Sequence, residues 1–103
     1  MRQKYNKWID ETSYTQSQPM GSVPPRTWEI RTHHMKITVH RLHWDENKHW
    51  FVTCYDLKVQ DHQLANKDII PAQEEALRFI DRMLVRYKRE IDELIEKEMR
   101  RET

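Results

Sequence analysis

Glycine is almost absent from this sequence, since Gly21 is the only one among 103 residues. Loops that cradle phosphate groups need several glycines, so a nucleotide-binding loop of that kind is excluded. The single cysteine, Cys54, excludes an internal disulfide framework and a cysteine-rich zinc site. One thiol fits a reducing compartment, and we expect a cytoplasmic protein. No run approaches the ~20 apolar residues of a membrane span, and the polar first residues are unlike a signal peptide, so we expect no membrane partner.

An excess of charge of one sign is also lacking, because 18 basic and 17 acidic residues leave a net charge of +1. The net charge is +2 over residues 1–34, zero over residues 35–70 and −1 over residues 71–103. None of these blocks is basic enough to indicate nucleic acid by charge alone. The length of the chain is that of a single domain.

The first part of the chain has little apolar surface. Residues 12–27 are rich in proline and small polar side chains, which do not offset the entropy lost on ordering. We therefore predict a mobile N-terminal tail over residues 1–27 and one domain over residues 28–103. Tyr5, Trp8, Ile9 and Tyr14 are the exceptions in the tail. They either dock on the domain or form a short segment that folds against a partner.

The middle of the chain has the pattern of a β-hairpin. Residues 35–40 alternate apolar and polar side chains, and residues 49–59 are dense in aromatic and β-branched residues. The polar residues 45–48 form the connecting loop, in which Asn47 is expected to take the left-handed conformation. A preceding strand is expected within residues 27–33, and residues 59–64 can add a short fourth strand.

Pairing Trp44 with His49 sorts the hairpin side chains onto two faces, and both faces are partly apolar. A slip of one residue would exchange the two sets. The first set is Met35, Ile37, Val39, Trp50, Val52 and Cys54, and the second is Thr38, His40, Leu42, Trp44, Phe51, Tyr55 and Leu57.

The last third of the chain predicts one long helix over residues 71–101. Pro71 suits the first helical turn, and neither glycine nor proline follows it. Apolar residues recur at spacings of three and four, as in a heptad seam. The seam is Leu77, Ile80, Leu84, Tyr87, Ile91 and Leu94. The predicted fold class is therefore α+β, with a three- to four-stranded antiparallel sheet followed by one long C-terminal helix.

A helix of this length outruns a small sheet, because it is about 50 Å long and the sheet is about 15–19 Å wide. We therefore expect a homodimer formed through Tyr87, Ile91, Leu94, Ile95 and Met99. Residues 78–89 carry five basic residues and one acidic, whereas residues 90–98 carry five acidic and one basic, which favours antiparallel pairing. The alternative is that these charges form a solvated face with pairs along one helix.

No arrangement of side chains predicts catalysis, a metal or a cofactor. The spacing of the six histidines does not place ligands on one strand face, and Cys54 lies within a strand on the side that we expect to face the core. Each acidic pair is explained by its place in a turn or in the first turn of the helix. We therefore expect no enzyme.

Two kinds of partner suit the exposed aromatic residues. Another protein is the first, because tryptophan, tyrosine and arginine dominate protein interfaces. Single-stranded nucleic acid is the alternative, with the sheet as a stacking platform and arginines on phosphates. The candidate residues are Leu42, Trp44, Phe51 and Tyr55 on the sheet and Arg78, Arg82, Arg86 and Arg89 on the helix.

About half of the chain resembles the HicB type of antitoxin domain. Asp56-Leu57 follows the second strand of the hairpin, and Glu74-Glu75-Ala76-Leu77 stands where that family's helix opens. The family's glycine-containing turn is absent. The resemblance implies a sheet-plus-helix module that binds and inhibits a partner protein, often as an oligomer. In topology alone, the order of strands and a final helix is also similar to dimeric PC4-like single-strand DNA binders. The favoured function is a small, non-catalytic, self-associating interaction module, an inhibitor or adaptor of the kind that phages and mobile elements encode.

Overall fold

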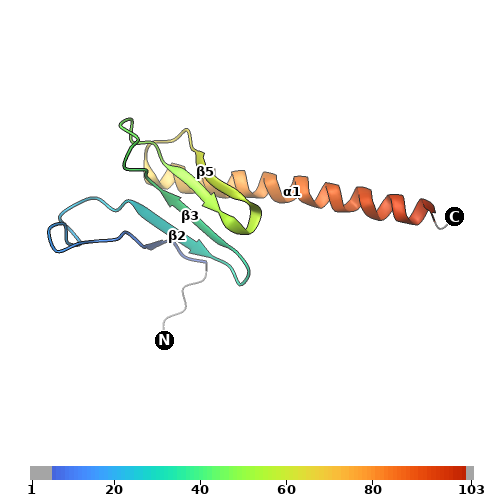
Figure 1. Ribbon diagram of the computed structural model, residues 1–103, viewed down its shortest axis with the longest axis horizontal. Helices are drawn as coiled ribbons and strands as arrows, with labels where there is room; N and C mark the ends of the chain where they lie inside the picture. Colours follow the sequence, from blue (N-terminus) through green and yellow to red (C-terminus); the bar gives the residue numbers. More distant parts are fainter. Residues whose placement is uncertain (1–5, 102–103) are drawn as a thin grey trace.

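A computed structural model describes residues 6–101, which form an antiparallel sheet followed by one helix (Figure 1). The predicted α+β class is confirmed, and the sheet has five strands in the order β1-β2-β3-β4-β5 where three or four were expected. Tyr5 lies outside the described residues. The elements are β1 (Ile9–Asp10), β2 (Thr27–Arg31), β3 (Lys36–His40), β4 (Phe51–Cys54), the 3₁₀ turn η1 (Tyr55–Leu57), β5 (Val59–Gln63) and α1 (Ile69–Arg101).

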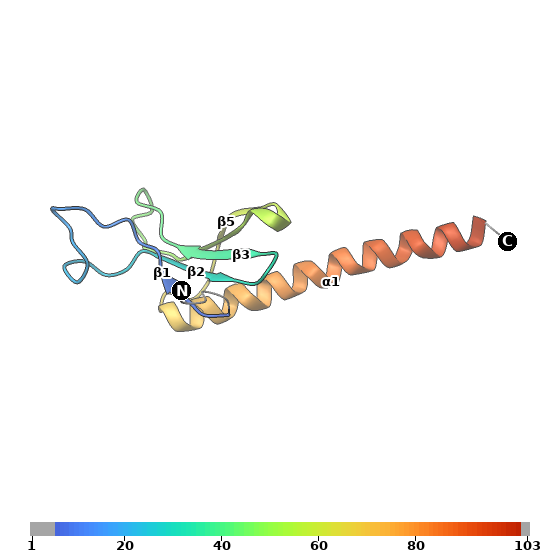
Figure 2. The same ribbon diagram turned by 90° about the horizontal axis from the view of Figure 1, so that it is seen from below.

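Helix α1 lies along one face of the sheet and then continues well beyond it (Figure 2). The described chain is 67 Å long and only 20 Å thick. Its radius of gyration is 17.7 Å, whereas a compact domain of this length has about 13 Å. The helix begins two residues before the predicted start at Pro71. Proline is tolerated there because the N–H groups of the first turn have no partner within the helix.

The hairpin register differs from the prediction, but the predicted faces are correct for the residues within β3 and β4. Leu57, which was predicted on the open face, lies in η1 and packs against the core. Val39 pairs with Val52, and His40 pairs with Phe51 instead of Thr53. This is a shift of two residues, and an even shift leaves every side chain on the same face. The face toward α1 holds Ile37, Val39, Trp50, Val52 and Cys54, all buried in the core.

The connection between β3 and β4 is longer than predicted, because residues 41–50 lie outside both strands. Two turns fill it, closed by hydrogen bonds from Asp45 N to Leu42 O and from Lys48 N to Asp45 O. The Asp45 carboxylate also accepts from His49 N at 2.8 Å. The prediction for Asn47 was wrong, since Lys48 takes the left-handed conformation (φ 56°). The hydrogen bonds that the Asp45 side chain accepts determine the shape of this loop, and they outweigh the preference of asparagine for the left-handed conformation.

Small residues allow the helix to approach the sheet closely. Ala72 and Ala76 are fully buried, and Ile80 is nearly so. Beside them, the Phe79 ring stacks on His62 of β5 with the ring centroids 4.0 Å apart. At the end of the sheet where the helix starts, the Trp50 indole N–H donates to Lys67 O at 2.9 Å. The core is therefore a single layer between the sheet and the first half of α1.

The sheet includes part of the predicted tail. Ile9 of β1 pairs with Glu29 of β2, which adds an edge strand that was not predicted, and Trp8 packs against the core. Thr12 is buried, and its hydroxyl oxygen accepts from Arg26 N at 2.8 Å. The prediction of a mobile tail was wrong for this segment, and the predicted docking of Trp8 and Ile9 on the domain is what the structure has, with the Thr12 hydrogen bond attaching the chain further along.

Candidate interaction surfaces

Some residues of the predicted heptad seam of α1 face the core, and others face solvent. Ile80 faces the core, and the Tyr87 hydroxyl donates to Leu57 O at 2.9 Å. Leu77 and Leu84, which alternate with them in the seam, are 38% and 39% exposed. Residues three apart on a helix differ by about 60° in direction, so a sheet on one side covers only one of the two rows. Tyr87 therefore contacts the 3₁₀ turn η1 of its own chain, although it was predicted to take part in self-association.

Beyond Tyr87 the helix carries apolar side chains that nothing in the described chain covers. The four residues of this part that were predicted to mediate self-association are each at least half exposed. Leu84, one turn before Tyr87, extends this apolar row toward the sheet. We call this set the free stripe. It consists of Leu84, Ile91, Leu94, Ile95 and Met99.

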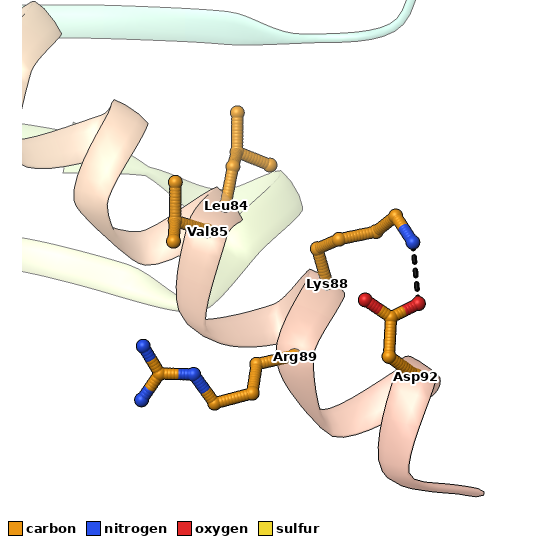
Figure 3. A pocket seen from close by; sticks show the side chains of 5 residues that line it. All are labelled: Leu84, Val85, Lys88, Arg89 and Asp92. Atoms are coloured by element: carbon orange, nitrogen blue, oxygen red, sulfur yellow. Dashed lines mark hydrogen bonds and ion pairs between the residues drawn. The ribbon is translucent and has the colours of Figure 1, made fainter. Parts of the chain in front are cut away.

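Figure 3 shows where the free stripe begins, at a shallow open hollow on the outside of the helix. Leu84 and Val85 form its apolar end, and Lys88, Arg89 and Asp92 form its charged end. Lys88 and Asp92, one turn apart, form an ion pair. A second shallow hollow farther along includes Ile95 and Met99. The surface is suited to another helix or a similar elongated element, because hollows and ridges follow one another along its axis.

The predicted arginine row is exposed, and only its last member, Arg89, lies beside the free stripe. Arg82 and Arg86 are each two positions from Leu84, and residues two apart lie on nearly opposite sides of a helix. Arg78 forms an ion pair with Glu74 at 2.9 Å, and Arg89 lines the charged end of the hollow. Arg82 and Arg86 therefore face solvent on the back of the helix, whereas Arg89 borders the hollow where the free stripe begins.

The predicted aromatic platform is only partly assembled. Phe51 is 5% exposed, and its ring contacts Trp44 with the centroids 6.3 Å apart. Leu42 is half-buried in the same loop as Trp44. Tyr55 lies beyond the other end of β4, in η1. Trp44 and Tyr55 are each about two-thirds exposed, so the structure offers two separate aromatic side chains in place of a continuous surface.

The sheet also separates the aromatic and arginine candidates. Phe51 lies on the face opposite to Val39 and Val52, and α1 covers the Val39 and Val52 face. One strand of nucleic acid would have to pass around the sheet to contact Phe51 and the helix arginines together.

The open face of the sheet holds a polar network that the sequence did not predict. His40 Nε2 lies 2.8 Å from Thr53 Oγ1 and 3.3 Å from Asp61 Oδ1, and Asp61 N donates to Thr53 Oγ1 at 3.0 Å. Asp61 has φ 50°, and the register shifts between Val52 and Cys54. No pattern in the sequence marks this irregularity.

This network does not have the geometry of a catalytic triad. Asp61 contacts the same histidine nitrogen as Thr53, whereas a triad needs the carboxylate on the other ring nitrogen. Thr53 is also buried, so its hydroxyl is inaccessible to a substrate. The contacts satisfy a buried hydroxyl between two strands.

Two further observations concern the other candidates for chemistry. Cys54 is fully buried, and burial raises the pKa of its thiol, which favours the thiol over the nucleophilic thiolate. Within residues 6–101, no three histidine, cysteine, aspartate or glutamate side chains are placed to hold a metal ion.

Comparisons with known proteins add no assignment to these surfaces. No protein-family model, curated protein or solved structure matches the chain. Over the part that the structure describes, no helix is both long enough and apolar enough to cross a bilayer.

Proposed function

We propose that this chain is a small, non-catalytic protein–protein interaction module that self-associates through the free stripe of α1. As an adaptor or inhibitor in the cytoplasm, it would present the open face of its sheet, with Trp44 and Tyr55 exposed, to a second protein. The observation that carries this proposal is the projection of α1 past the hydrogen bond from Tyr87 to Leu57 of η1, with Ile91, Leu94 and Ile95 each more than half exposed.

A partner would stabilise a projecting helix of this kind. The part beyond Tyr87 is 14 residues long and continues a helix that is nucleated on the sheet, but it has no tertiary packing of its own, which supplies most helical stability in proteins. Ion pairs such as Lys88–Asp92 and Arg101–Glu98 join residues three or four apart, but each adds only about 0.3–0.5 kcal/mol. Burial of apolar side chains against another chain supplies a larger stabilisation.

Amide hydrogen exchange measured at several protein concentrations tests this proposal. We expect the amides of residues 90–100 to exchange more slowly as the concentration rises, because dimers protect this part of the helix. Residues 76–83 pack on the sheet and serve as the internal control, with protection that does not depend on concentration. Protection of residues 90–100 that stays constant up to hundreds of micromolar would overturn the proposal.

A further inference from the structure

The outward row of α1 contains two charged residues placed symmetrically about two isoleucines. Leu84, Lys88, Ile91, Ile95 and Glu98 follow one another at spacings of four, three, four and three, so they form one line along the helix. All five are exposed. We call this line the spine. Lys88 and Glu98 are equally far from residue 93, and so are Ile91 and Ile95.

We propose that the occupant of the free stripe is a second copy of this chain, bound antiparallel with the two-fold axis opposite Glu93. This inference rests on the proposed function and specifies its partner and geometry. In this register Ile91 of one copy faces Ile95 of the second copy, and Lys88 faces Glu98. Each contact occurs twice because of the symmetry.

The charges of the spine discriminate against the parallel alternative. In a parallel pair in register, Lys88 would face Lys88 and Glu98 would face Glu98 of the second copy. Like charges at facing positions are unfavourable, whereas the antiparallel register replaces both with opposite pairs. Within one chain Lys88 forms an ion pair with Asp92, and Glu98 forms one with Arg101.

The rest of the surface is compatible with this register. The paired region extends from Lys88 to Glu98, beyond the Tyr87 contact with Leu57, so each sheet lies outside it at opposite ends of the dimer. The hollow beside Leu84 and Val85 (Figure 3) lies where the second copy's helix brings Met99. Met99 is 65% exposed in the single chain, and Val85 is 54% exposed.

Charge reversal tests the register by thermodynamic rescue. Lys88→Glu and Glu98→Lys should each raise the dimer dissociation constant about tenfold, because each creates two like-charge pairs. The double variant K88E/E98K should return to within about threefold of the wild type, because opposite charges face each other again. A parallel dimer would show little change in either single variant and no rescue, and that result would overturn the proposal.

Matched control variants change the same charges away from the spine. Lys97→Glu and Glu93→Lys alter exposed residues on the opposite side of α1, so neither should change the dissociation constant by more than about twofold. Circular dichroism of each variant verifies that the helix content is unchanged. Equal weakening by K97E and K88E would show a general charge effect and contradict the register.

Cysteine cross-linking gives an independent readout of direction. Helix axes pack about 8–10 Å apart and each Cα lies about 2.3 Å from its axis, so facing Cα atoms come within about 3.4–5.4 Å, a range that overlaps the Cα separation of a disulfide. Under mild oxidation, a mixture of K88C and E98C proteins should form a cross-linked dimer between the two variants, and neither protein alone should do so. Cys54 is fully buried, and the wild-type chain is the blank.

The two levels of the proposal fail differently. If the wild-type chain is a monomer in these experiments, self-association itself is wrong and the register with it. If the wild type is a dimer but K88C alone cross-links efficiently, the helices pair in parallel. In that case the antiparallel register is wrong and the proposed function stands.

Discussion

Replacing Ile95 with alanine should weaken the dimer by an amount that follows from its exposure. Ile95 is 52% exposed in the single chain, so about half of its surface remains to be buried on association. Full burial of an isoleucine is worth about 1.5–3 kcal/mol, so the half that remains contributes about 0.8–1.5 kcal/mol. The residue occurs twice in the dimer, which gives about 1.5–3 kcal/mol and a dissociation constant about 10- to 150-fold higher. Alanine also favours the helix, so the single chain is not weakened.

Sedimentation equilibrium measures this change, with Ile70→Ala as the matched control. Ile70 lies at the start of the same helix and is 72% exposed, and the substitution removes the same atoms. It lies far from the paired region and should leave the dissociation constant unchanged. The reasoning is refuted if I95A binds within a factor of two of the wild type, or if I70A weakens the dimer as much as I95A does.

Two further predictions concern folding and the alternative partner. The Glu75 carboxylate accepts hydrogen bonds from Ala65 N at 2.8 Å and Asn66 N at 2.9 Å, so Glu75→Ala should lower the free energy of unfolding in urea by about 1–3 kcal/mol. Burial opposes the ionisation of Glu75, but these bonds outweigh it and hold its pKa below the ordinary value. Its contribution is therefore present above the unfolded pKa and lost as the pH falls through the lower folded pKa, so E75A should be less sensitive to acid than the wild type. For an oligonucleotide of single-stranded DNA, we expect no binding at low salt by fluorescence anisotropy, because Phe51 is buried and the arginines lie across the sheet from it. Tight binding that collapses with added salt would favour the nucleic-acid alternative.

The sequence predicted the long-range layout of this fold better than its local details. The helix was recognisable because its apolar period continues for many turns without glycine or proline. Within the paired strands the two faces were correct although the register was not, because Val39 and Val52 keep their side under a shift of two residues. Strand β1 is too short to leave a periodic pattern, and its position depends on contacts of Trp8 and Thr12 with residues distant in the sequence.

The candidate surface on α1 could be predicted because it depends on the length of the helix. The candidate surface on the sheet could not, because it depends on the local geometry of the loops. The exposure of Ile91, Leu94, Ile95 and Met99 follows from a helix longer than the sheet that it covers. The burial of Phe51 depends on how residues 41–50 fold back over β4, which no residue pattern specifies. The left-handed Asp61 and the register shift beside Thr53 are likewise set by tertiary hydrogen bonds.

The central claim is that the projecting half of α1 buries its free stripe against a second copy of the chain. Sedimentation equilibrium of the wild-type protein, from low to hundreds of micromolar, tests it most directly. We predict that the weight-average mass rises from the 12.8 kDa of one chain toward twice that value and no further. A mass that stays at 12.8 kDa at the highest concentration would contradict the claim.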